Sequence, residues 1–233
     1  MKTFSFTFAR GGSKGLKNKN MVELAGIPLV GRASLQARSI SQIDKHFVST
    51  DSQEIAAIAE TYGAEIIVRP QELATDNAVE WHAWQHAVKY VMDKYGNFDQ
   101  FVSLPCTSPL RNDSDIIKCL NKDVQLGQVV ISYTDAHRNP WFNLLKVKDS
   151  SAHLLEPVCK DENVSYFRRQ DAPTCYDMTT VAYAAKPSTI LQYKNLFELD
   201  FLGVYIPPER ALDIDTSYDF AIARVLFESK KND

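Results

Sequence analysis

Residues 2–20, which read KTFSFTFARGGSKGLKNKN, decide the fold. The first part has phenylalanine at positions 4, 6 and 8, and this alternation is typical of a β-strand. The part from Arg10 to Asn20 follows directly and holds three glycines and four cations. Glycine lets backbone N–H groups approach an anion closely, and arginine and lysine pair with phosphate oxygens. This cationic loop therefore predicts a triphosphate site at the end of a strand, and its alternative is a flexible, solvated turn.

Beyond this loop, short apolar runs alternate with amphipathic stretches along the chain. The runs predict strands at residues 46–49, 65–68, 100–104, 128–133, 180–185 and 201–206. The amphipathic stretches predict helices at 27–40, 52–62, 79–95, 113–122 and 218–229. This order favours a single α/β domain over residues 1–233, with a mainly parallel, Rossmann-like sheet covered by helices on both faces.

The alternation breaks between residues 135 and 180. This segment is polar, shows no strong helical period and contains Pro140, Pro157 and Pro173. A structureless loop of this length is uncommon inside a compact domain. We therefore expect an antiparallel excursion that leaves the sheet and packs on a second subunit of a homodimer.

Composition excludes several classes of protein. The net charge of −3 and the lack of a basic tail argue against nucleic-acid binding. No run approaches the roughly 18 apolar residues of a membrane-spanning helix, and the first residues lack the apolar core of a signal peptide. The four cysteines are widely spaced, which favours reduced thiols over disulfides or a zinc site. These features predict a cytoplasmic protein without nucleic-acid or membrane partners.

A pair of aspartates, in Asp213-Ile214-Asp215, follows the last predicted strand. In an extended segment, residues i and i+2 project to one side, so both carboxylates can face one cation. Mg²⁺ is commonly held by one or two carboxylates plus substrate phosphates. Both aspartates are therefore candidate magnesium ligands, with ordinary surface carboxylates as the alternative.

The loop after residues 100–104 is rich in hydrogen-bond donors. Two prolines fix its backbone, and its candidate substrate contacts are Thr107, Ser108 and Arg111. The alternative is a rigid turn that caps the helix beginning near residue 113. In open parallel sheets, ligands bind at the carboxyl ends of the strands, so this loop, the cationic loop and the aspartate pair are expected to meet there.

Together these motifs resemble the acylneuraminate cytidylyltransferases, the CMP-sialic acid synthetases. The matching strings, in family order, are A-R-x-x-S-K-G-L-x-x-K-N from Ala9, S-T-D at 49–51, R-P-x-E-L-A-x-D at 69–76, T-S-P-L-R at 107–111, R-Q at 169–170 and D-I-D at 213–215. The resemblance implies a three-layer fold like that of nucleotide-diphospho-sugar transferases, and a homodimer whose excursion reaches into the partner. It also implies a Mg²⁺-dependent reaction of CTP with a nine-carbon 2-keto sugar acid, which yields the CMP-sugar and pyrophosphate.

The resemblance also implies roles for individual residues. The implied nucleotide-binding set is Arg10, Gly11, Gly12, Ser13, Lys19, Asn20 and Asp76, with Asn77 near the nucleotide or the sugar. The implied metal ligands are Asp213 and Asp215, and the implied catalytic set is Arg10, Lys19 and Asp215. The expected sugar contacts are Thr107, Ser108, Arg111, Arg169, Gln170 and Asp177. No general base is assigned, because positioning and charge neutralisation carry most of such a transfer.

The sequence departs from the family where the sugar is expected to bind. Many members have Gln-Pro before T-S-P-L-R, whereas this chain has Pro105-Cys106. Some bacterial members have an arginine after R-Q, where this chain has residues 176–180 with Asp177. A reversed charge beside an anionic sugar favours a nonulosonic acid other than N-acetylneuraminate, such as a diamino-dideoxy relative.

Other functions stay open at the level of sequence. They are a cytidylyltransferase for another 2-keto sugar acid such as an octulosonate, a metal-dependent glycosyltransferase that uses D-I-D, and an inactive nucleotide-binding scaffold. His82 and His86 are expected to pack rather than to bind zinc, because no third ligand is evident. Cys106 is expected to be an ordinary small residue of its turn, because no partner base can be identified.

Overall fold

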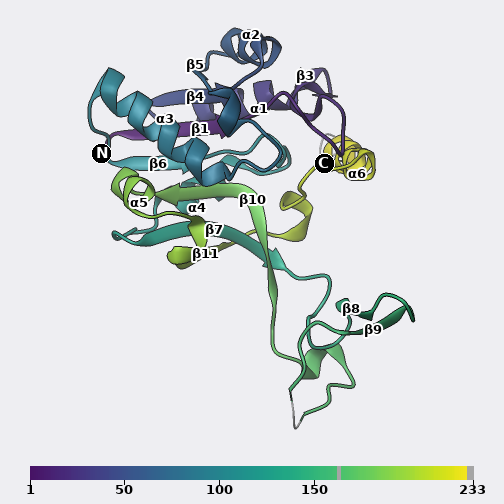
Figure 1. The fold of residues 1–233 in the computed structure, drawn as a ribbon. Coiled ribbons are helices and arrows are strands. Elements are labelled where there is room, and N and C mark those ends of the chain that lie inside the picture. The colour runs from purple at the N-terminus through teal and green to yellow at the C-terminus, as the bar shows by residue number, and fades with distance from the viewer. Residues whose placement is uncertain (162–163, 230–233) are drawn as a thin grey trace.

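Strand β1 (Thr3–Phe8), formed by the alternating phenylalanines, lies inside a seven-stranded sheet of order β11-β7-β10-β6-β1-β4-β5 (Figure 1). The computed structural model describes residues 1–161 and 164–229, so the last four residues of the predicted domain lie outside it. The other strands are β4 Lys45–Thr50, β5 Glu65–Val68, β6 Gln100–Ser103, β7 Gln128–Asp135, β10 Tyr176–Ala185 and β11 Asp200–Tyr205. Every pairing in the sheet is parallel except the two that β10 makes, which confirms the predicted mainly parallel sheet.

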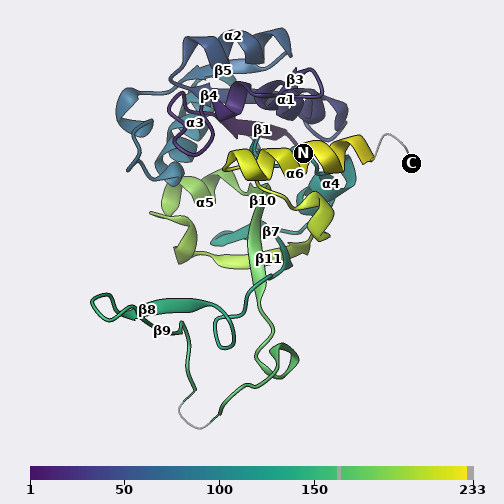
Figure 2. The same ribbon diagram turned by 90° about the vertical axis from the view of Figure 1, so that its right-hand side faces the viewer.

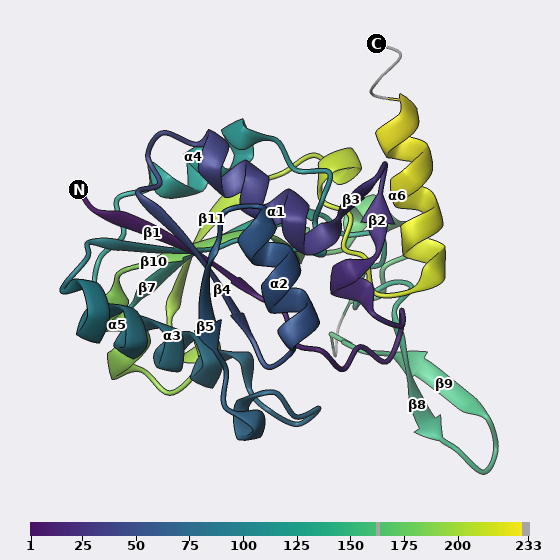
Figure 3. The same cartoon turned by 90° about the horizontal axis from the view of Figure 1, so that it is seen from above.

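Helices cover both faces of the sheet and complete three layers (Figure 3). One face carries α3 (Glu80–Tyr95) and α5 (Pro187–Gln192). The other face carries α1 (Leu29–Ser39), α2 (Gln53–Thr61), α4 (Asp113–Leu120) and α6 (Ser217–Ser229). Within the part of the chain that the structure describes, no helix is both long and apolar enough to cross a membrane.

The alternation in β1 divides its side chains between the two outer layers. Phe4 and Phe6 are fully buried and belong to the apolar cluster beneath α3. Ser5 and Thr7 point to the opposite side, where Ser5 Oγ lies 2.8 Å from His46 Nδ1 and Thr7 Oγ1 donates to a carbonyl oxygen at 2.6 Å. Because these partners satisfy the buried hydroxyls, a strand that alternates apolar and polar residues can be covered on both faces.

Several elements differ from the predicted ones by a few residues at an end, and one short helix is not predicted. The helix expected at 27–40 begins two residues later, because Ile27–Pro28 forms the short strand β3, which pairs with β2 (Glu23–Leu24). The pattern does not predict α5, whose six residues are too few to show a helical period. Strand β10 begins at Tyr176 rather than at 180, since its first residues pair with β7 beyond the core and are exposed.

Strands β7 and β10 lead into a segment that projects from the sheet (Figures 1 and 2). It holds an antiparallel hairpin of β8 (Leu145–Asp149) and β9 (Leu154–Pro157), where an antiparallel excursion is predicted; residues 162–163 of that excursion lie outside the described ranges. Leu145, Val147, Leu154 and Leu155 are each at least half exposed. A lone two-stranded hairpin is marginally stable in water, so this apolar surface is suited to contact with another surface.

Candidate functional site

A cavity of about 580 Å³ lies at the carboxyl edge of the sheet, where ligands bind in open parallel sheets. Its walls come from segments that are far apart in sequence: the cationic loop, residues 69–80, the turn after β6, strand β10 and residues 213–216. The predicted nucleotide and metal residues that line it are Arg10, Ser13, Lys19, Asn20, Asp76, Asp213 and Asp215. The fold thus brings together two of the constellations that the sequence singles out, the cationic loop and the aspartate pair.

The cationic loop is held against the sheet and against residues 213–216. Gly11 N donates to Asp51 Oδ1 at 3.0 Å, and Asn20 Nδ2 donates to the carbonyl oxygen of Arg10 at 3.0 Å. A Cβ atom on Gly15 would lie 2.3 Å from the carbonyl oxygen of Asp215. The two backbones therefore touch, and only glycine permits this approach.

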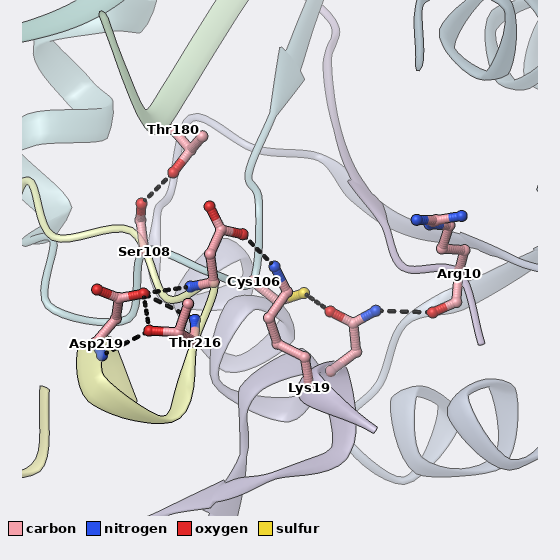
Figure 4. Close-up of polar contacts among 9 residues, drawn as sticks. Arg10, Lys19, Cys106, Ser108, Thr180, Thr216 and Asp219 are labelled. Atoms are coloured by element: carbon pink, nitrogen blue, oxygen red, sulfur yellow. Dashed lines mark hydrogen bonds and ion pairs between the residues drawn. The ribbon is translucent and has the colours of Figure 1, made fainter. Parts of the chain in front are cut away.

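Carboxylates pair with the loop cations. Asp76 bridges two of them, with Oδ1 at 2.7 Å from Arg10 Nη1 and Oδ2 at 2.6 Å from Lys14 Nζ. The hydrogen bonds from Lys14 and Arg10 lower the pKa of Asp76 and keep it ionised. Lys19 Nζ lies 2.7 Å from Asp215 Oδ1 (Figure 4). Cations that hold carboxylate oxygens at these distances can hold phosphate oxygens in the same way.

Asp213 and Asp215 approach the cavity from the segment before α6. Asp213 Oδ1 is buried and has no hydrogen-bond partner. Burial raises the pKa of the Asp213 carboxyl, and the charge of Asp215 adds to this, while hydrogen bonding to Thr107 and Thr180 opposes it. Asp219, in the first turn of α6, accepts from the backbone N–H groups of Asp215 at 3.1 Å and Thr216 at 2.8 Å, which fixes this segment (Figure 4).

A divalent cation suits these two carboxylates. An orphaned buried oxygen beside a second carboxylate is a natural position for a cation. Among the residues that the structure describes, no three histidine, cysteine, aspartate or glutamate side chains gather in a metal-binding group. A cation held by Asp213 and Asp215 would therefore complete its coordination with ligand oxygens, which is the way proteins commonly bind Mg²⁺.

The turn after β6 presents one of its three predicted donors to the cavity, Thr107. Ser108 is fully buried, and its Oγ lies 2.7 Å from Thr180 Oγ1. Arg111 is buried as well and donates to the carbonyl oxygen of Val181 at 3.2 Å. Ser108 and Arg111 are absent from the cavity lining, and their contacts favour the rigid turn that the sequence left as the alternative.

The remaining predicted sugar contacts lie apart from the cavity within this chain. Arg169 and Gln170 line a second cavity of about 320 Å³, together with Arg138, where the projecting segment begins. Asp177 lines neither cavity, and its Oδ2 accepts from the backbone N–H of His137 at 3.4 Å. Within a single copy of the chain, these predicted sugar-binding residues therefore lie apart from the predicted nucleotide-binding residues.

Several polar residues line the main cavity without a role assigned from sequence, and among them are Arg69, Glu80 and Tyr183. Arg69 donates to Ser49 Oγ at 3.1 Å and to the Ser49 carbonyl oxygen at 2.7 Å. Glu80 accepts from Trp84 Nε1 at 3.1 Å, and desolvation raises the pKa of Glu80. The R-P-x-E-L-A-x-D motif is a signal for Arg69. No sequence signal marks Glu80, because acidic residues are common in the first turn of any helix.

Comparison with known proteins gives a consistent result. The sequence model of a family described as Cytidylyltransferase matches residues 8–202. Post-translational flagellin modification protein B of Campylobacter coli is 36% identical over 95% of this chain and 93% of that protein. CMP-N,N'-diacetyllegionaminic acid synthase of Campylobacter jejuni is 34% identical over 95% of this chain and 93% of that protein. N-acylneuraminate cytidylyltransferase of Escherichia coli is 30% identical over 96% of this chain but 51% of that longer protein.

Among solved structures, CMP:2-keto-3-deoxy-manno-octonic acid synthetase complexed with CTP is similar to this chain with a TM-score of 0.70. The match covers 99% of this chain and 100% of that chain. Because the sequence identity is 15%, this likeness concerns the fold alone. It confirms the predicted fold of the nucleotide-diphospho-sugar-transferase type.

Proposed function

The chain belongs to the cytidylyltransferase family, and we propose that it couples CTP to a nonulosonic acid, with release of pyrophosphate and formation of the CMP-sugar. The observation that carries this proposal is the meeting of the loop cations and two aspartates across one cavity. A triphosphate substrate would use both, since the cations neutralise its phosphates and the carboxylates would hold a metal ion that adds positive charge beside them. Retention of all these groups at the cavity weighs against an inactive scaffold.

In the proposed reaction the anomeric hydroxyl of the sugar attacks the α-phosphorus of CTP in line and gives up its proton to solvent. The bond between the α-phosphorus and the bridging oxygen breaks, and pyrophosphate leaves. Arg10, Lys14 and Lys19 bind the triphosphate and offset the charge that develops on the leaving group. Asp213 and Asp215 would hold Mg²⁺, which supplies further charge neutralisation and lowers the pKa of a bound hydroxyl. No side chain is assigned as general base, because positioning and electrostatics carry most of such a transfer.

The proposed sugar is a diamino-dideoxy nonulosonic acid rather than N-acetylneuraminate. Pro105 lines the cavity and has no side-chain donor, where the family resemblance leads us to expect glutamine. The legionaminic acid synthase, whose name records two acetylated amino groups, matches this chain at 34% identity, against 30% for the acylneuraminate enzyme. Both observations support a sugar pocket that differs from the one for N-acetylneuraminate.

A panel of sugar acids tests the proposal. The protein is incubated with CTP, Mg²⁺ and one acid at a time, and pyrophosphate release and the mass of the product are measured. We expect kcat/KM to be at least about tenfold higher for a diamino-dideoxy acid than for N-acetylneuraminate. A clear preference for N-acetylneuraminate contradicts the sugar assignment, and a preference for an octulosonate favours that alternative. CTP binding without product from any acid supports the scaffold, and consumption of a CMP-sugar supports a glycosyltransferase.

The protein is proposed to act as a homodimer in which the β8–β9 hairpin contacts the partner. The hairpin carries exposed apolar side chains, and Arg169, Gln170 and Asp177 lie on the same projecting segment, away from their own cavity. A projecting segment that reached the other subunit would bring these residues to the sugar in the partner's site.

We expect the double variant Val147→Asp/Leu155→Asp to raise the dimer dissociation constant by about tenfold or more, because these cross-strand neighbours share one apolar face. Analytical ultracentrifugation measures the fraction of dimer. The rate of pyrophosphate release should fall as this fraction falls, while CTP binding persists. Lys148→Asp, on the same strand, is the matched control. A double variant that stays dimeric and active removes the hairpin from the proposed interface.

A further inference from the structure

The side chain of Asn20 connects two loops of the cavity. Asn20 is buried in the short 3₁₀ turn Lys19–Met21 (η1), directly after a proposed triphosphate ligand. Its Nδ2 donates to the carbonyl oxygen of Arg10 at 3.0 Å, at the other end of the cationic loop. Its Oδ1 lies 3.0 Å from Cys106 Sγ, in the turn after β6 (Figure 4). One amide therefore joins both ends of the cationic loop to the turn after β6.

The orientation of this amide follows from its two partners. The carbonyl oxygen of Arg10 can only accept a hydrogen bond, so it requires the NH₂ group of Asn20. The thiol of Cys106 is then the donor to Oδ1. Burial raises the pKa of Cys106 to about 11, so the sulfur keeps its proton at neutral pH and can donate. Without that donor, the buried Oδ1 would have no partner, which is costly.

We propose that Cys106 is a positioning residue that fixes the amide of Asn20 and, through it, the cationic loop for the triphosphate. The proposal rests on the proposed function only in taking the ligand to be CTP. It replaces the expectation that Cys106 is an ordinary small residue of its turn. A merely space-filling residue would have no need of a donor, whereas this position has Oδ1 of Asn20 within hydrogen-bond distance.

The test compares variants that separate volume from hydrogen bonding. Cys106→Ser keeps a donor, and Cys106→Val replaces the thiol by apolar groups that cannot donate. We expect Cys106→Val to weaken Mg²⁺–CTP binding by about tenfold, measured by calorimetry without sugar, and to raise KM for CTP with little change in kcat or in KM for the sugar. Cys106→Ser should restore binding to within about twofold.

A double-variant cycle with Asn20→Ala distinguishes positioning from a general effect on folding. If Cys106 acts through Asn20, adding Cys106→Val to Asn20→Ala should cause no further loss of CTP binding. Additive losses, a serine variant as weak as the valine variant, or a valine variant that binds like the wild type each overturn the proposal. Melting temperatures identify a variant that fails to fold, and Cys106→Ala then replaces Cys106→Val with the same expectations.

The same variants are titrated with inorganic tripolyphosphate, which reports on the cationic loop without a base or sugar. A wild-type protein that binds tripolyphosphate but not CTP contradicts the proposed function. The dissociation constants of the serine and valine variants for tripolyphosphate can still be compared, and their ratio then decides the role of Cys106.

Discussion

Asp215→Ala is expected to lower kcat on the order of 10³-fold while leaving the fold intact. The substitution removes one of the two carboxylates proposed to hold Mg²⁺, together with the anion that faces Lys19. The side chain of Asp215 is 69% exposed, and an exposed ion pair contributes only about 0–1 kcal/mol to stability. Pyrophosphate release at saturating CTP and sugar measures the loss, and calorimetry measures the melting temperature.

The control for this substitution is Asp93→Ala, which removes an exposed carboxylate from α3 outside the cavity. It should leave both kcat and the melting temperature close to those of the wild type. Activity of Asp215→Ala within about tenfold of the wild type would exclude Asp215 as a metal ligand, since loss of a true ligand costs more.

Gly15→Ala is expected to lower kcat/KM for CTP by about 10²-fold and stability by about 1–3 kcal/mol. The added Cβ would lie 2.3 Å from the carbonyl oxygen of Asp215, a backbone atom that cannot rotate away. The cationic loop and residues 213–216 must then separate. Because the proposed reaction needs the loop cations and the aspartates around the same phosphates, a small separation affects both sides of the site at once.

Gly12→Ala is the comparison variant in the same loop, because a Cβ there meets no protein atom within 4 Å. It makes the same chemical change without displacing the aspartates. Gly12 belongs to the implied nucleotide-binding set, so a loss of CTP affinity in this variant reports on the nucleotide contact, and unchanged stability is its expected difference from Gly15→Ala. Denaturant unfolding and CTP-dependent kinetics of both variants are compared. Equal effects of the two substitutions would show that loop flexibility, rather than the contact between Gly15 and Asp215, controls activity.

Much of the sheet could be predicted because its signals are local. The alternation of Phe4 and Phe6 with small polar residues fixes which side of β1 faces which layer. Strand β5 was predicted at 65–68 and is found at Glu65–Val68, between a helix and Arg69-Pro70. The meeting of the cationic loop with the aspartate pair also follows from topology, since the strands that precede both run in parallel to one sheet edge. The family motifs then predicted the cytidylyltransferase assignment, which the comparisons confirm.

The direction of individual side chains could not be read in the same way. Arg111 lies in the predicted donor loop, yet the packing of this turn against β10 draws its guanidinium to the carbonyl oxygen of Val181. Tyr183 reads as an ordinary strand residue, and only the position of β10 beside β6 brings it to the cavity. The direction of such a side chain depends on neighbours that are far away in sequence, so periodicity and motif spacing do not predict it.

Arg10 and Lys14 already hold the carboxylate of Asp76. An arriving triphosphate therefore exchanges one anion for another instead of meeting bare cations. Asp76 is tethered beside them and competes at high effective concentration, so a small anion such as inorganic phosphate gains little by displacing it. A triphosphate that contacts several cations at once can displace the Asp76 carboxylate. We therefore expect this internal counter-ion to disfavour small anions relative to polyanions, and to make nucleotide affinity less sensitive to salt than four loop cations alone would suggest.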